Sequence, residues 1–133
     1  MCLRLEYLKP KIADKNIICY KLVKRTKVKG IYESIFQKFE YTIKKLYTNN
    51  ISIEFSNNII KHFKTNCIEV PNCYIIEGGM FHSYKNYISV ILIGLPNEAF
   101  LKCIIPKGAY YYEGHFHHFT SYASSQIKIL EEI

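Results

Sequence analysis

The sequence predicts a small single domain over residues 1–133, of the α+β class, with a mainly antiparallel sheet and one or two helices. The chain has 133 residues and is 49% hydrophobic, which is enough to bury one core. Short runs that alternate apolar and polar residues recur along it, as in half-buried strands. One segment carries the start and stop signals of a helix. No Pro/Gly/Ser-rich linker or internal repeat divides the chain.

The first half reads as strands separated by turns. Asn16–Val23 is β-branched and aromatic and predicts a first strand, followed by a basic turn over Lys24–Gly30. Phe39–Tyr47 alternates apolar and polar side chains and predicts a second strand. The next stretch reads as a turn, a strand, and a polar loop or insertion with room for one helical turn, at Asn49-Asn50, Ile51–Phe55 and Asn57–Asn72.

The predicted helix lies in the middle of the chain. A short apolar strand, Cys73–Glu77, is ended by two glycines. Ser83 then stands where it can cap a helix over Lys85–Ile93, which a following glycine and proline would end. The alternative for Tyr87–Ile93 is a buried strand, because Ile and Val dominate there.

The last third carries the strongest turn and strand signals. Ala99–Ile105 predicts a strand, and Pro106–Gly108 predicts a turn, with proline presetting one dihedral angle and glycine permitting a positive φ. Ala109–Glu113 predicts the strand that follows. Gly114–Ser125 reads as a loop rich in histidine and aromatic residues. Gln126–Ile133 alternates again and predicts a final strand.

The net charge of +7 is unevenly distributed along the chain. Residues 1–64 hold 14 Lys and Arg against 5 Asp and Glu, and the remainder holds 4 against 6. The densest run consists of Lys21, Lys24, Arg25, Lys27 and Lys29. A basic half attracts nucleic acid, nucleotides or an acidic protein; the alternative is a solvated, lysine-rich loop. Arginine is scarce, which argues against specific reading of the DNA major groove.

Cysteine usage and hydropathy indicate the compartment. The five cysteines are odd in number, and Met1–Leu8 lacks the apolar core of a signal peptide, so reduced thiols are expected. The longest apolar stretch, Ile88–Leu95, is far shorter than the roughly 20 residues that span a bilayer. We therefore expect a cytoplasmic protein with no membrane partner.

One constellation follows the two glycines of the middle segment. Phe81 or Tyr84 can stack a nucleobase, and His82 and Ser83 can hydrogen-bond to a phosphate or a ribose. The alternative is a turn with a core phenylalanine and a buried, hydrogen-bonded histidine.

Two other constellations are less specific. His115–His118 holds three histidines, which bind Zn²⁺ or Ni²⁺ when further ligands join them; the alternatives are an exposed aromatic loop or a contact with a ligand or partner. Tyr110–Tyr112 alternates across a predicted strand, so one face is core and the other suits an interface. Glu113 as a general base, or a cysteine nucleophile, would act alone. No phosphate-binding loop, dinucleotide fingerprint, GxSxG motif or DNA-binding signature occurs, and the sequence indicates no cofactor.

Several segments in a fixed order carry a resemblance. They are Met1–Leu3 (MCL), Lys9–Ala13 (KPKIA), Tyr20-Lys21, Gly79–Tyr84 (GMFHSY), Lys102–Gly108 (KCIIPKG), Tyr111–Gly114 (YYEG) and Tyr122–Ser125 (YASS). Together they resemble small proteins of phages and prophages of low-GC bacteria, which carry a GFHSF segment, a CIIPKG-YY-G hairpin and a closing AS-IK-EEI strand. The abundance of Ile, Lys, Asn, Tyr and Phe is typical of such AT-rich genomes.

The resemblance implies a host-directed role, similar to that of the Thoeris anti-defence sponges. Those proteins are compact oligomers that bind an immune signalling nucleotide and hold it without hydrolysis. By this resemblance the protein would be a homo-oligomer in the host cytoplasm that takes a cyclic nucleotide or a cyclic ADP-ribose. The candidate ligand-binding residues are Phe81, His82, Ser83, Tyr84, Lys21, Lys24, Arg25, Lys107 and Tyr112. Lysine would replace the arginines that usually grip phosphates, without their bidentate geometry.

Three other function classes stay open. A basic half and tyrosine-rich faces also suit a protein-binding inhibitor of a host defence or CRISPR effector. A nucleotide-processing or ADP-ribosyl-transfer-like enzyme would show turnover and depend on His82 or Glu113. A nucleic-acid-binding protein would show a steep salt dependence of affinity.

Overall fold

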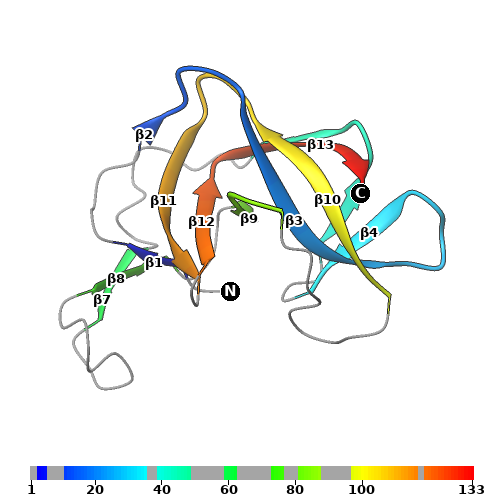
Figure 1. Ribbon diagram of the computed structural model, residues 1–133, viewed down its shortest axis with the longest axis horizontal. Helices are drawn as coiled ribbons and strands as arrows, with labels where there is room; N and C mark the ends of the chain where they lie inside the picture. The colour runs from blue at the N-terminus through cyan, green and yellow to red at the C-terminus, as the bar shows by residue number, and fades with distance from the viewer. Residues whose placement is uncertain are drawn as a thin grey trace.

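A computed structural model describes residues 3–5, 11–35, 39–48, 59–62, 73–76, 81–87, 97–116 and 119–133. These form one antiparallel sheet of thirteen strands (Figure 1). The strands are β1 (Leu3–Leu5), β2 (Lys11–Ile12), β3 (Ile17–Arg25), β4 (Ile31–Ser34), β5 (Glu40–Thr42), β6 (Leu46–Thr48), β7 (Ile59–His62), β8 (Cys73–Ile76), β9 (Phe81–Tyr84), β10 (Glu98–Ile105), β11 (Tyr110–Phe116), β12 (Phe119–Ser124) and β13 (Gln126–Glu132).

The sheet closes on itself through β12 and β13. These two strands are one run of chain that turns at Ser125. On one side β12 pairs with β9 and β9 with β3; on the other, β13 pairs with β10 and β10 with β3. β3 and β10 form the long curved pair that crosses Figure 1. The ring of pairings β3–β10–β13/β12–β9 therefore encloses the main core.

The remaining strands extend this ring at its margins. β4 pairs with the end of β3 and also with β5, and β6 pairs with β13. β11 pairs with β12, β1 and β2, and β1 carries β8 and β7. β5 and β6 are joined by a short turn at Ile43-Lys44, so this turn and its two strands lie at one margin of the ring.

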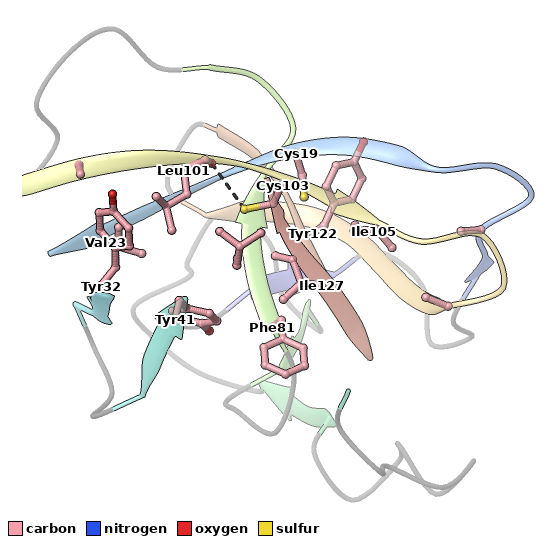
Figure 2. Packing of buried hydrophobic residues seen from close by; sticks show 14 residues of the cluster. Cys19, Val23, Tyr32, Tyr41, Phe81, Leu101, Cys103, Ile105, Tyr122 and Ile127 are labelled. Atoms are coloured by element: carbon pink, nitrogen blue, oxygen red, sulfur yellow. Dashed lines mark hydrogen bonds between the residues drawn. The ribbon is translucent and has the colours of Figure 1, made fainter. Parts of the chain in front are cut away.

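Strict alternation of side chains builds the core. Along β10, Ala99, Leu101, Cys103 and Ile105 are buried while the residues between them are less so. Leu101, Ile105 and the two inward isoleucines of β13 are fully buried, and each contributes roughly 1.5 to 3 kcal/mol to folding. Figure 2 shows Ile127, Val23 and Leu101 converging between the strands of the ring. A second, smaller cluster holds Leu22, Tyr84 and their neighbours.

The prediction of an α+β fold is wrong, because no described residue is helical. Ser83 does not cap a helix: it lies in β9, opposite Tyr122 of β12. Lys85–Tyr87, the first described residues of the predicted helix, form a bend, and the rest of that helix lies outside the described residues. Pairing of β9 with both β3 and β12 satisfies its backbone in the sheet, which outweighs the local capping signal.

The predicted strand over Phe39–Tyr47 is two strands. A turn at Ile43-Lys44 separates β5 from β6, and Lys44 takes a left-handed φ of 67°. The turn contains neither glycine nor proline, the two residues that most strongly mark a turn in a sequence. Backbone bonds hold it in place, since Lys44 N donates to Ile129 O at 2.8 Å and Ile129 N donates to Lys45 O at 3.1 Å.

The predicted loop over Gly114–Ser125 is mostly strand, because β11 runs to Phe116 and β12 begins at Phe119. Its aromatic and threonine residues are good strand formers. Likewise β7 lies within the predicted polar loop, and β4 lies between the predicted basic turn and Phe39, where the sequence pattern predicts no element. The predicted strands that overlap β3, β8, β10, β11 and β13 are confirmed as strands, although β3 extends to Arg25, into the predicted basic turn, and β11 extends to Phe116. The turn before β11 is also confirmed, with Gly108 at φ 89°. Asn49-Asn50 and Ile51–Phe55 lie outside the described residues.

Candidate functional site

The predicted ligand segment Phe81–Tyr84 is a buried strand. Phe81 and His82 are each 8% exposed, Ser83 1% and Tyr84 3%. Phe81 belongs to the main core, Tyr84 to the smaller cluster. Phe81 is therefore a core residue, as the alternative interpretation of this segment expected, but the segment is a strand and not a turn.

Lys21 is the most unusual side chain of the predicted basic run. It lies on the inner face of β3 between Cys19 and Val23, both buried, and is itself 7% exposed. Its Nζ donates to the carbonyl oxygen of His82 at 2.6 Å and lies 5.0 Å from the ring centroid of Tyr41. Among the described residues no carboxylate forms an ion pair with it. Burial lowers the pKa of Lys21 to about 8, because a desolvated ammonium without a counter-ion loses stability.

Four aromatic rings and two lysines form what we call the aromatic–lysine cluster: Phe39, Tyr41, Tyr47, Phe81, Lys21 and Lys45. The Phe39 ring centroid lies 4.9 Å from that of Tyr41, 5.5 Å from Tyr47 and 6.0 Å from Phe81. The Tyr41 and Tyr47 centroids are 5.2 Å apart. Figure 2 shows Tyr41 and Phe81 entering the core from β5 and β9. These separations and tilted geometries are those of favourable ring contacts.

The aromatic–lysine cluster runs from the surface into the core. Phe39 is 39% exposed, Tyr47 is half-buried, and Tyr41 is 3% exposed. Lys45, an exposed residue of the β5–β6 turn, holds its Nζ 5.2 Å from the Tyr47 ring centroid. Lys21 contacts Tyr41 at the inner end. The cluster thus offers an exposed ring beside an exposed cation, with a second cation behind it.

Sequence reasoning missed most of this cluster. Phe39, Tyr41 and Tyr47 have odd numbers in one alternating segment, a signal that all three share a face if the chain stays extended. The contribution of Phe81 depends on the ring of pairings, which brings β9 close to β5 and β6.

His82 is buried without a hydrogen-bond partner for either ring nitrogen among the described residues. Burial, and secondarily the positive charge of Lys21, lowers the pKa of His82 to about 3. The imidazole is therefore neutral at physiological pH and unsuited to gripping phosphate as a cation.

Cys19 and Cys103 face each other across β3 and β10. Both are fully buried free thiols, and both point into the core (Figure 2). A hydrogen bond from the Cys103 thiol, helped by the nearby Lys21 ammonium, lowers the pKa of Cys19 against the cost of burial, while the pKa of Cys103 is raised. The Ser83 hydroxyl faces this pair and has no partner with full hydrogen-bond geometry.

The other predicted ligand residues do not converge on this cluster. Lys24 and Arg25 are exposed at the end of β3. Arg25 is bound to Glu132 at 2.6 Å, and Lys24 stands in register between Glu33 and Glu98. Lys107 lies just beyond Ile105, at the other end of β10 from Glu98, the register partner of Lys24. The eight residues of β10 span about 26 Å at roughly 3.3 Å per residue.

The remaining candidates occupy structural positions. Tyr112 is 1% exposed. Glu113 forms ion pairs with Lys11 at 3.7 Å and with Lys85 at 3.3 Å. His115 is exposed at the end of β11, and His117 and His118 lie outside the described residues. Among the side chains that the structure describes, no group of three or more His, Cys, Asp or Glu is placed to hold a metal ion.

The part of the chain that the structure describes contains no helix long and apolar enough to cross a membrane. Comparison with protein-family models, with curated proteins and with solved structures finds no match to this chain.

Proposed function

We propose that the protein binds a small anionic molecule with an aromatic ring, of the nucleotide class, at the aromatic–lysine cluster, and sequesters it unchanged. The observation that carries the proposal is the exposed ring of Phe39, which leads inward through Tyr47 and Tyr41 to a buried lysine that has no carboxylate partner among the described residues.

The cluster matches the two halves of a nucleotide. A base stacked on an aromatic side chain gains about 1 to 3 kcal/mol, and Phe39 and Tyr47 present rings for this. Lys44 and Lys45 are exposed in the adjoining turn and supply point charges for phosphates. This arrangement relocates the proposed site from Phe81–Tyr84 to the β5–β6 margin, with Phe81 as its inner wall.

Two features favour holding over turnover. Glu113, the candidate general base, is engaged in ion pairs with Lys11 and Lys85. His82, the candidate acid or base, is buried with its pKa lowered to about 3. Together with the resemblance to anti-defence sponges, these features support a phage protein that lowers the free concentration of a cyclic nucleotide or cyclic ADP-ribose signal in its host.

Replacing Phe39 with alanine is expected to weaken nucleotide binding by roughly five- to 150-fold, because the exposed stacking surface is lost. The measurement is calorimetric titration with cyclic di- and trinucleotides, cyclic ADP-ribose isomers and NAD. The bound ligand is then released by heating the protein, and its mass is measured. Tyr87→Ala is the matched control, since Tyr87 is a 50% exposed ring that contacts Tyr20 and Phe100 instead.

A matched lysine pair tests the anionic half. Lys45→Gln is expected to weaken binding severalfold and to reduce its salt dependence, whereas Lys107→Gln, an exposed turn lysine, leaves binding unchanged. Equal losses in Phe39→Ala and Tyr87→Ala would contradict the assigned site. Release of a converted ligand would replace sequestration with catalysis, and no binding of any compound would overturn the proposal.

A further inference from the structure

The antiparallel register brings two cysteine thiols face to face in the core. Arg25 N donates to Asn97 O at 2.8 Å, and the β3–β10 register is unbroken from there to Ile17 and Ile105. Hydrogen-bonded pairs alternate along such a ladder, so Cys19 and Cys103 form one of them. The Cα atoms of such a pair lie about 5.5 Å apart, inside the roughly 4.4 to 6.8 Å that disulfides span.

The surroundings of this cysteine pair favour chemistry at sulfur. Lys21 lies two residues along the same face of β3 and favours a thiolate at Cys19 electrostatically. The Cys103 thiol lies within hydrogen-bonding distance of two acceptors, Cys19 and the Leu101 carbonyl, the latter at 3.6 Å. A cation and a second thiol beside Cys19 favour its ionisation, as in reactive cysteines, while the full burial of both sulfurs means that reaction must await local opening.

The β10–β13 ladder is irregular at this point. Its register shifts between Lys102 and Cys103, and such bulges disrupt the ladder locally. Both cysteines are 0% exposed, so the reaction requires the sheet to open locally, and this irregularity is where we expect the opening.

We propose that Cys19 and Cys103 form a thiol redox site, which closes to an intramolecular disulfide by exchange with a small disulfide of the glutathione type. The Cys19 thiolate attacks one sulfur of the small disulfide, the S–S bond breaks, and one small thiolate leaves. The Cys103 thiol gives up its proton and attacks the Cys19 sulfur of the mixed disulfide, which releases the second small thiolate. The protein loses two electrons and two protons, and the small disulfide becomes two thiols.

The test uses the full chain with Cys2, Cys67 and Cys73 replaced by serine, so that only the facing pair is left. The folded protein is treated with oxidised glutathione, quenched in acid, unfolded and alkylated with a maleimide, and analysed by intact mass and peptide mapping. We expect a product that has lost two hydrogens, takes no maleimide, and links the peptides that carry Cys19 and Cys103. Adding Cys103→Ser to this background should give only the mixed disulfide at Cys19.

The position of Lys21 gives a second measurement. Lys21→Met should raise the pKa of the Cys19 thiol and slow the reaction by roughly threefold for each pKa unit. The smaller fraction of thiolate outweighs the greater nucleophilicity of the more basic thiolate. A folded protein that still takes two maleimides, after a treatment that oxidises it in urea, would overturn the proposal. So would oxidation no faster than global unfolding. No nucleotide is present in this test, so its result is independent of the proposed function.

Discussion

Replacing Lys21 with methionine is expected to stabilise the protein at pH 7 by roughly 1 to 3 kcal/mol, although it removes a hydrogen bond and a cation–π contact. In the folded protein the pKa of Lys21 is lowered from 10.5 to about 8. Keeping the buried ammonium charged at pH 7 therefore costs roughly 3 kcal/mol. Methionine fills a similar volume without that cost.

The pH dependence identifies the cause. A lowered pKa in the folded state means that the unfolded state holds the proton more tightly, so Lys21 costs stability most below pH 8 and least above pH 10.5. The advantage of Lys21→Met should therefore shrink by roughly 2 kcal/mol between pH 7 and pH 9.5. Urea unfolding of both proteins at each pH measures this difference, and the variant-minus-wild-type comparison cancels the ionisation of tyrosines.

A less stable Lys21→Met variant, or an advantage that does not change with pH, would show that Lys21 is a satisfied structural group. If the expected gain appears, Lys21 lowers the stability of the natural protein, as residues at functional sites often do. The proposed function then predicts that the same variant binds nucleotides more weakly than the wild type.

The second large effect is an acid sensitivity caused by His82. Its pKa is lowered from 6.5 to about 3 in the folded protein, so the unfolded state takes up the proton first. The stability that its neutral form provides is complete above about pH 6.5 and is lost progressively as the pH falls toward 3. Between pH 7 and pH 4.5 this group alone should cost roughly 2.5 kcal/mol.

The variant His82→Leu tests this expectation. It keeps the site filled and apolar but has no ring to protonate, so its stability should fall by roughly 2.5 kcal/mol less than that of the wild type from pH 7 to pH 4.5. Urea midpoints at both pH values give the comparison. His115→Leu is the control, because His115 is exposed and should leave the wild-type slope unchanged. Parallel losses in His82→Leu and the wild type would exclude His82 as the cause.

Local pattern predicted the strands that have one buried and one exposed face. β10 and β13 alternate between buried and more exposed residues along most of their length, and the turn before β11 follows from proline and Gly108. The same logic failed where alternation continues through a turn, as at Lys44, and where strand-forming residues include histidine and glycine, as in β11. In both cases the partner strand decides the conformation, and the partner is not encoded locally.

The candidate site divides in the same way. Phe39 and Tyr41 share one face by their spacing, which the sequence displays, whereas the turn at Ile43-Lys44 brings Tyr47 beside them. Lys21, by contrast, lies in a run of cations that reads as a solvated surface, yet its neighbours Cys19 and Val23 on the same face are buried. Period-two alternation therefore also contained the signal that Lys21 points inward, and the charge of the run obscured it.

A domain rich in antiparallel strands, the positions of most long strands and the uneven placement of charge follow from the sequence pattern, because these depend on residues close together in the chain. Closure of the sheet through β12 and β13, the burial of Phe81–Tyr84 and the facing of Cys19 and Cys103 follow from the folded arrangement. So does the contact of Phe81 with the aromatic rings of the β5–β6 margin. These outcomes depend on which distant strands pair and in what register, and register is set by the burial of whole faces against one another.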